Sequence, residues 1–365
     1  MLDNFYENLK KNIFEVKEYN KISIFTISTT SKQEDEPYLT PIRYSKDFSA
    51  FGCVIFNQSI ILNIIEIMDG QVDIILVDGE KKIPLTIYRD IDEVNNVFYK
   101  TRKTIGLVET GNLSKICFMY VKKSKIYEYK PNDLTVNATW MFLSHRFKEL
   151  SGKKITVLGV GNIGSKLSLK LVECGAQVHI HRTNSFVGHL IEQGLNCIKP
   201  QNTVSKIEFH QNPLQASFMS EIVIGASNGV QVINVDIVKS LSRNCLIVDL
   251  GKNNITPDAI DYATSQGIEI YRSDITSAFE GYIYEILKME NILCSSYGKK
   301  DLGFCTVVGG GYFGSDGDIV VDKIISPEVV IGVAAGDGSI KKNLNEEDKK
   351  RLERLMKEFN IETVW

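Results

Sequence analysis

The ten residues ITVLGVGNIG, at positions 155–164, decide the fold of this chain. Their first four side chains are apolar or β-branched, and glycines in the order G-x-G-x-x-G follow at once. Apolar side chains then recur every three or four positions from Ile163 to Cys174, which predicts a helix that Gly175 ends. A second strand is expected at 177–180. This order of strand, glycine turn, helix and strand predicts a βαβ unit.

Apolar runs of similar length continue beyond that unit. The further strands that we expect lie at 221–224, 245–250 and 268–271, with helices at 235–241 and between Thr256 and Gly267. Runs without polar–apolar alternation are typical of a parallel sheet covered on both faces. The sequence therefore predicts that residues 133–297 form an α/β domain with a doubly wound parallel Rossmann sheet.

The region before it, residues 1–132, predicts a separate N-terminal α/β domain that would bind the substrate. Its expected strands lie at 21–27, 72–77 and 115–121, and its expected helices at 59–68 and 92–103. A helix at 133–150 with apolar side chains on two faces should connect the two domains.

The last part of the chain, residues 298–365, has a different composition. Ten of the 27 glycines lie between positions 298 and 338, which excludes a long helix there. A capping box at 277–280 predicts a helix that returns to the first domain at the cleft. Beyond the glycines we expect strands at 319–321 and 329–333, then an amphipathic helix with Leu352, Leu355, Met356 and Phe359 inward. We expect a small α+β appendage that packs on the N-terminal domain or forms the interface of a homo-oligomer, most simply a dimer.

Charge and hydropathy exclude several classes of protein. The net charge of −3 lacks the basic excess of a protein that neutralises nucleic-acid phosphates. The most apolar stretch, 60–68, is shorter than the roughly 20 residues that cross a bilayer. The first eleven residues are too polar for a secretory signal. We expect a cytoplasmic protein that binds neither nucleic acid nor membrane.

Cysteine and histidine patterns give no metal or disulfide signature. The seven cysteines are odd in number, widely spaced and never arranged as C-x-x-C, so we expect reduced thiols. The five histidines lack the spacing of a zinc site, and we expect no metal.

The glycine turn has the residues that a dinucleotide pyrophosphate requires. Gly159 permits the tight turn, Gly161 lets the phosphates approach the backbone, and Gly164 lets the helix lie close to the strand. Asn162 and Ile163 open that helix, whose N-terminal amides and partial positive charge attract phosphate.

The end of the second strand favours NADP over NAD. An NAD site usually has an acidic side chain there for the ribose 2′-hydroxyl, whereas this chain has His181, Arg182 and Thr183. A guanidinium with a neighbouring hydroxyl would bind the additional 2′-phosphate. The alternative is that Arg182 is a solvated loop arginine.

These residues, with the segments 150–154, 221–229 and 246–251, resemble the NADP-binding domains of shikimate dehydrogenase, glutamyl-tRNA reductase and methylenetetrahydrofolate dehydrogenase. The resemblance covers about residues 133–275 and concerns the nucleotide domain rather than a substrate. It implies that the His-Arg-Thr stretch serves the 2′-phosphate. It also implies that Ala226, Ser227, Asn228 and Gly251 line the nicotinamide side of the cleft.

The catalytic signatures of those families are poorly matched outside that segment. A hydride transfer needs a proton donor or acceptor near the reacting heteroatom, and a lysine of lowered pKa is a common choice. The candidates are Lys46, Lys103 and Asp274; Tyr99 and Lys103 have the Tyr-x-x-x-Lys spacing of the folate enzyme.

The sequence as a whole predicts an NADP(H)-dependent oxidoreductase that transfers a hydride to or from a small polar substrate in an interdomain cleft. Two alternatives stay open. One is a redox-neutral enzyme with a tightly held cofactor, of the cyclodeaminase or epimerase type. The other is a nucleotide sensor without chemistry.

Overall fold

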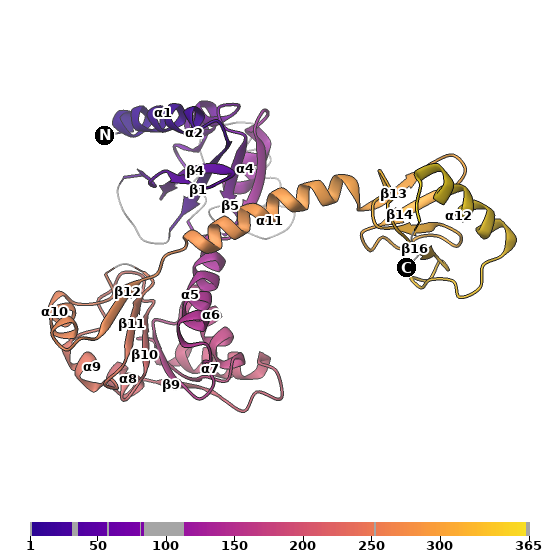
Figure 1. The fold of residues 1–365 in the computed structure, drawn as a ribbon. Coiled ribbons are helices and arrows are strands. Elements are labelled where there is room, and N and C mark those ends of the chain that lie inside the picture. The colour runs from indigo at the N-terminus through magenta and orange to yellow at the C-terminus, as the bar shows by residue number, and fades with distance from the viewer. Residues whose placement is uncertain are drawn as a thin grey trace, which may run out of the picture. The chain divides into compact units, whose positions relative to one another are not determined.

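The computed structural model describes residues 2–30, 36–56, 58–80, 82–83, 113–251 and 253–362. Figure 1 draws the chain, which divides into two compact units, Met1–Ala278 and Phe279–Trp365. The first unit contains two six-stranded sheets and the second a four-stranded sheet.

The second sheet of the first unit has the strand order β12-β11-β10-β7-β8-β9, and all its neighbouring strands are parallel. Counted along the chain from β7, this is the order 3-2-1-4-5-6 of the doubly wound Rossmann sheet. The predicted fold class is therefore confirmed. The strands are β7 (Lys154–Leu158), β8 (Gln177–His181), β9 (Ile207–His210), β10 (Ile222–Gly225), β11 (Leu246–Asp249) and β12 (Glu269–Arg272).

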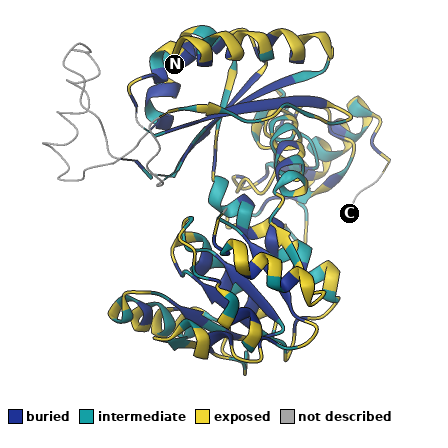
Figure 2. Cartoon of the chain, turned by 90° about the vertical axis from the view of Figure 1, so that its left-hand side faces the viewer, coloured by how far each residue is buried: buried dark blue, intermediate teal, exposed yellow. Residues whose placement is uncertain are grey.

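Helices cover both faces of this sheet, and Figure 2 shows its buried strands between helices with exposed outer sides. The two faces have separate hydrophobic clusters, which explains why the strands are apolar on both sides. The edge strand β9 and the short α8 were not predicted, because Glu208 and His210 interrupt the apolar run of β9. The helices are α6 (Asn162–Glu173), α7 (Ser185–Ile198), α8 (Pro213–Ser217), α9 (Val235–Ser240) and α10 (Pro257–Ser265).

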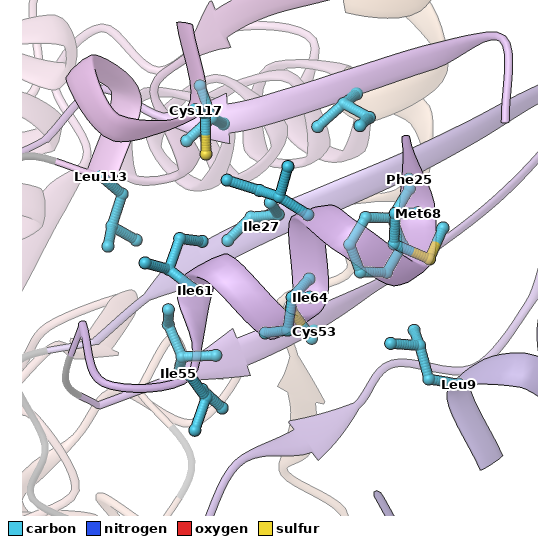
Figure 3. Packing of buried hydrophobic residues seen from close by; sticks show 14 of the residues in the cluster. Leu9, Phe25, Ile27, Cys53, Ile55, Ile61, Ile64, Met68, Leu113 and Cys117 are labelled. Atoms are coloured by element: carbon cyan, nitrogen blue, oxygen red, sulfur yellow. The ribbon is translucent and has the colours of Figure 1, made fainter. Parts of the chain in front are cut away.

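The N-terminal sheet has the order β2-β4-β1-β5-β6, with β3 paired to β4. Its four longer strands are parallel, and β2 and β3 run antiparallel to β4. The strands are β1 (Ile22–Thr29), β2 (Tyr38–Leu39), β3 (Arg43–Tyr44), β4 (Phe48–Ile55), β5 (Ile74–Asp78) and β6 (Lys125–Tyr129). Helices α1 (Leu2–Glu18), α2 (Ile61–Met68) and α4 (Leu113–Tyr120) belong to the same half. Figure 3 shows side chains of α2 and α4 packed against β1 and β4.

The predicted strand at 115–121 is wrong, because this segment belongs to helix α4. Leu113, Ile116 and Cys117 are buried at helical spacing, whereas Phe118 is half exposed, as the outer face of a helix requires. The helix expected at 92–103 lies outside the described residues.

Helix α5 (Pro131–Phe147) follows β6 after a single residue, Lys130. Its buried Leu143 joins the hydrophobic cluster of α6, and the Trp140 indole N–H donates to Cys174 Sγ at 3.4 Å. The predicted connecting helix is confirmed, although it ends at Phe147 and not at Leu150.

The second unit contains a mixed sheet in the order β13-β14-β15-β16, with helix α12 as its amphipathic partner. Leu355 of α12 is fully buried, and Leu352, Met356 and Phe359 pack against the same cluster, as expected. The elements are α11 (Thr276–Ser295, which starts in the first unit), β13 (Gly298–Asp301), β14 (Thr306–Gly309), β15 (Ile319–Val321), β16 (Val330–Val333) and α12 (Glu346–Phe359). Among the described helices, none is both long enough and apolar enough to cross a bilayer.

Candidate functional site

The glycine turn between β7 and α6 distinguishes glycines that the fold needs from one that it does not. Gly159 has φ +103°, and a Cβ there would lie 2.6 Å from the Ala226 carbonyl carbon. A Cβ on Gly164 would lie 2.2 Å from the Gly159 carbonyl oxygen. A Cβ on Gly161, in contrast, meets nothing within 4 Å. The absence of a side chain at Gly161 therefore leaves open space beside the backbone, which is what an approaching phosphate needs.

Helix α6 presents its N-terminus at the same place. Gly161 is its N-cap residue and offers no side-chain hydrogen bond to the first turn. The first amides of a helix have no partners within the helix, and together with the helix dipole they form an anion site. The turn therefore has both the space and the donors for a pyrophosphate.

A cleft of about 1160 Å³ lies beside this turn, between the two halves of the first unit. Its walls follow the carboxyl ends of β1, β5, β10 and β11 and the starts of α5 and α6, the place where α/β sheets bind ligands. The lining residues are Thr29, Thr30, Tyr38, Val54, Gly79, Glu80, Lys82, Lys130, Asn132, Thr135, Gly161, Asn162, Ile163, Lys166, Ala226, Asn228, Leu250 and Gly251.

Six of the expected cofactor-binding residues line this cleft: Gly161, Asn162, Ile163, Ala226, Asn228 and Gly251. Asn162 lies at the boundary between the halves, since Asn132 of α5 donates to its Oδ1 at 3.2 Å. Ser227 lies behind this wall, with its hydroxyl donating to the Val230 carbonyl oxygen.

Asn254 supports the loops that follow β10 and β11, which carry the cleft residues Ala226, Asn228 and Gly251. It is fully buried, and its Oδ1 accepts from the Ser227 backbone N–H at 2.8 Å while its amide donates to Asp249. The loop after β10 is thereby tied to the end of β11. Sequence reasoning missed Asn254 because its role depends on contacts between loops about 25 residues apart, for which periodicity gives no signal.

Arg182 follows β8 and reaches back to the glycine turn. Its Nη1 donates to the Val160 carbonyl oxygen at 2.8 Å. His181 is buried, with Nδ1 3.1 Å from the His210 carbonyl oxygen, and Thr183 is exposed. Asn184 caps α7 by accepting from Val187 N–H, so its side chain serves the fold. No carboxylate occurs between 181 and 185.

The expected proton partners lie elsewhere or outside the described residues. Lys103 lies outside the described residues. Lys46 lines a separate hollow of about 730 Å³ with Lys17, Lys21 and Asp73, near the amino end of β1 and not at the cleft.

Asp274 serves as a helix cap. Its carboxylate accepts from the Thr276 backbone N–H at 2.9 Å and from the Thr276 hydroxyl at 2.6 Å. These hydrogen bonds, with a smaller effect of Arg43, lower the pKa of Asp274 below its usual value. The helix accordingly begins at Thr276, one residue before the expected capping box.

Sequence reasoning missed the charged side chains that line the cleft, which are Glu80, Lys82, Lys130 and Lys166. Lys82 is the one held by two carboxylates of its own loop. Its Nζ lies 2.8 Å from Asp78 Oδ2, 3.0 Å from Glu80 Oε2 and 3.3 Å from the Thr29 carbonyl oxygen. Only 12% of the Lys82 side chain is exposed. The sequence DGEKK, at 78–82, has the composition of a solvated turn. Gly79, Glu80 and Lys82 nevertheless line the cleft, because they follow the carboxyl end of β5.

Asp78 fixes the position of that lysine. Its side chain is fully buried, and Oδ2 accepts from the Thr29 backbone N–H at 3.0 Å and the Thr29 hydroxyl at 2.9 Å. Oδ1 accepts from Glu80 N–H at 2.8 Å. A buried carboxylate with four hydrogen-bond donors is rigidly held, and it orients Lys82 at the cleft surface.

Similarity to known proteins is confined to solved structures. No protein-family model matches the chain, and no curated protein matches it. Solved structures similar to it include NAD(P)-binding Rossmann-type dehydrogenases and dipicolinate synthase.

The similarity in each case is low. A putative formate dehydrogenase from Pyrobaculum aerophilum matches at 15% identity over 41% of this chain, with a TM-score of 0.30, and only about half (54%) of that enzyme is covered. A dipicolinate synthase chain from Bacillus halodurans matches at 14% identity over 73% of this chain and 97% of its own, with a TM-score of 0.35. Shikimate 5-dehydrogenase from Thermus thermophilus, in complex with shikimate, matches at 13% identity over 38% of this chain and 49% of its own, with a TM-score of 0.30.

Proposed function

We propose that the chain is an NADP(H)-dependent oxidoreductase that acts on a small polar substrate in the cleft of its first unit. The observation that carries this proposal is the open space at Gly161, next to the uncapped start of α6 and at the wall of a large cleft. Parallel α/β sheets bind dinucleotides at the point where the strand order reverses. In this sheet that point lies between β7 and β10, and the cleft is lined by residues that follow these two strands.

The residues present fit such a cofactor along its length. The amides at Gly161 and Asn162 would hold the pyrophosphate, and Arg182 the 2′-phosphate, since no carboxylate occurs between positions 181 and 185 to repel it. Ala226, Asn228 and Gly251 would face the nicotinamide ring. When bound, the nicotinamide supplies or accepts the hydride.

Lys82 replaces Lys46 and Asp274 as the proton partner in this proposal. It lines the cleft, and its ammonium has three donors, two of which face the carboxylates of Asp78 and Glu80. A substrate acceptor would replace the longer 3.3 Å contact to the Thr29 carbonyl oxygen. Asp78 and Glu80 hold that nitrogen at the cleft surface, so that the ammonium can donate to an oxygen or nitrogen as a hydride reaches the adjacent carbon. Asp78, being buried behind the lysine, is a positioning residue.

The first experiment measures binding. Titration calorimetry with NADPH and NADH should give a tight complex with NADPH and a weaker one with NADH. If neither nucleotide binds, the proposal is wrong.

The second experiment measures turnover. NADPH absorbance is followed with a panel of small 2-oxo acids and imines, using wild type, Lys82→Gln and Lys46→Gln. Loss of the proton partner should lower turnover by about 10²–10⁴-fold while NADPH affinity is retained. Lys46→Gln is the matched control and should behave as wild type. NADPH binding without consumption of any substrate would instead favour the redox-neutral or sensor alternatives.

A further inference from the structure

Strands β8 and β9 form the polar edge of the Rossmann sheet. They pair in parallel, with His179 opposite Glu208 and His181 opposite His210. The intervening residues Val178, Ile180 and Ile207 point into the hydrophobic cluster shared with α6 and α7. Because side chains alternate between the faces of a strand, the histidines and Glu208 share the other face.

Three ligating atoms come together on that face. His179 Nδ1 lies 2.8 Å from His210 Nε2 and 3.8 Å from Glu208 Oε2, and all three atoms lie within 4.8 Å of one another. The two imidazole rings are stacked, with centroids 5.0 Å apart and planes at 29°. The strand pairing fixes the backbones of all three residues.

We propose that His179, Glu208 and His210 form a binding site for a divalent cation of the zinc type. Two imidazole nitrogens and one carboxylate oxygen are a common ligand set for zinc, with the fourth position left to water. Imidazole ligands favour zinc, copper and nickel over magnesium and calcium. The Glu208 side chain is 59% exposed, so water can reach this ligand.

The observed geometry needs only a small adjustment to accept the ion. Two nitrogens bound to zinc at about 2.0–2.1 Å in a tetrahedron are about 3.3 Å apart. The 2.8 Å contact between the two ring nitrogens would therefore open by about half an ångström. A small rotation of one imidazole ring about its side-chain bonds is enough for this. Without the ion, one ring nitrogen donates its proton to the other, and the rings stay in place. With the ion, that proton moves to the remaining nitrogen of the same ring.

Lys154 is the charged group that opposes a cation here. It lies on β7, next to β8, and its Nζ donates to the Phe218 carbonyl oxygen at 2.7 Å. Its ammonium acts electrostatically on both histidines and on Glu208. Replacing it by methionine should therefore strengthen cation binding.

The site has a structural consequence. It would link the edge strand β9 to β8 just before His181 and Arg182, the residues at the proposed 2′-phosphate position. The inference does not depend on the proposed function, because cation binding can be measured with the protein alone.

The test is competition of the full chain, stripped with a chelator, against a chromophoric zinc chelator at neutral pH. One zinc per chain is expected. His210→Gln and Glu208→Gln should each weaken binding by at least about 10-fold. Lys154→Met should tighten it. His189→Gln, at an exposed histidine with Glu192 3.2 Å away, is the matched control and should bind as wild type.

Cobalt identifies the ligands independently. The Co²⁺ complex should lack thiolate charge-transfer bands, which separates this site from the exposed Cys174, Cys197 and Cys294. Glu208 is exposed, so its variant should fold, and circular dichroism checks this for each protein. The proposal is overturned if wild type takes up no zinc, if thiolate bands are present, or if His189→Gln loses as much affinity as His210→Gln.

Discussion

Arg182 and Val160 join the end of β8 to the glycine turn: the Arg182 guanidinium donates to the Val160 carbonyl oxygen at 2.8 Å. A guanidinium has five N–H donors, and this contact uses one of them. Within the part of the chain that the structure describes, the other donors have no acceptor and could bind a phosphate next to the turn. The same side chain thus serves the fold and the proposed cofactor.

Arg182→Ala is expected to reduce NADPH affinity far more than NADH affinity. A charge-assisted contact to the 2′-phosphate is worth about 1.5–3 kcal/mol, or about 10–150-fold. Loss of the Val160 contact affects both nucleotides by a smaller amount, about 0.5–1.5 kcal/mol. Calorimetric titration of both nucleotides measures the difference. Equal losses would contradict the NADP assignment.

Gly161→Ala and Gly164→Ala form a matched pair with opposite expectations for stability. The added methyl group at position 161 meets open space and the backbone there has φ −88°, so the variant should be as stable as wild type. It should nevertheless lose dinucleotide affinity, because the methyl group occupies the phosphate position.

The methyl group at position 164 collides with the Gly159 carbonyl oxygen and should cost about 1–3 kcal/mol in the free energy of unfolding. Urea unfolding and NADPH titration of both variants provide the measurement. Undiminished NADPH binding by Gly161→Ala would argue against a pyrophosphate at this turn.

Asn254→Ala should destabilise the Rossmann half by about 1–3 kcal/mol, because it leaves buried polar groups of Asp249 and Ser227 without their partner. It should also weaken NADPH binding, since the loops after β10 and β11 are no longer tied together. Gln193→Ala, at an exposed position of α7, is the control. Denaturant unfolding compares the two, and equal stability would show that the network contributes nothing.

Asp348 makes the second unit sensitive to acid. Its side chain is fully buried and accepts from Lys341 at 2.7 Å and Arg351 at 3.0 Å, and the Lys341 contact is the main reason that its pKa is below the ordinary 3.8. A carboxyl group with a lowered pKa in the folded state stabilises the fold above about pH 3.8, and this contribution is lost as the pH falls through the lowered value.

Asp348→Asn should therefore lower stability at neutral pH by about 1–3 kcal/mol and make it less dependent on pH in the acid range. Glu353→Gln, on the exposed side of α12, should change neither. Thermal unfolding of the full chain at several pH values tests this, and an unchanged acid response in Asp348→Asn would refute the assignment.

The Rossmann half could be predicted because its signals are local. Residues 155–164 contain the strand, the turn and the start of the helix in one continuous stretch, and the spacing of the three glycines can be recognised without knowing any distant contact. The N-terminal half was harder to predict from the sequence. Strand β4 is buried along its whole length but contains Ser49 and Gly52 among its apolar residues, so it gave no apolar run.

Gly52 shows why the position of β4 depends on tertiary contact. A Cβ there would lie 1.8 Å from Thr26 Oγ1 of β1, a contact that only the sheet creates. The strand predicted at the position of α4 was wrong for the reverse reason: a continuous apolar run suits a buried strand as well as a helix. Lys82, the proposed proton partner, could not be found from the sequence, because its place in the cleft wall depends on its contact with the buried Asp78.

The contact of Trp140 with Cys174 gives the molecule its own optical reporter. The chain has only two tryptophans, Trp140 and Trp365, and thiols quench indole fluorescence. Cys174 is exposed, so a mild alkylating reagent can reach it while the buried Cys53 and Cys117 stay protected. The emission of Trp140 should brighten as that thiol is capped, and in the untreated protein it should follow any separation of α5 from α6 without an attached dye.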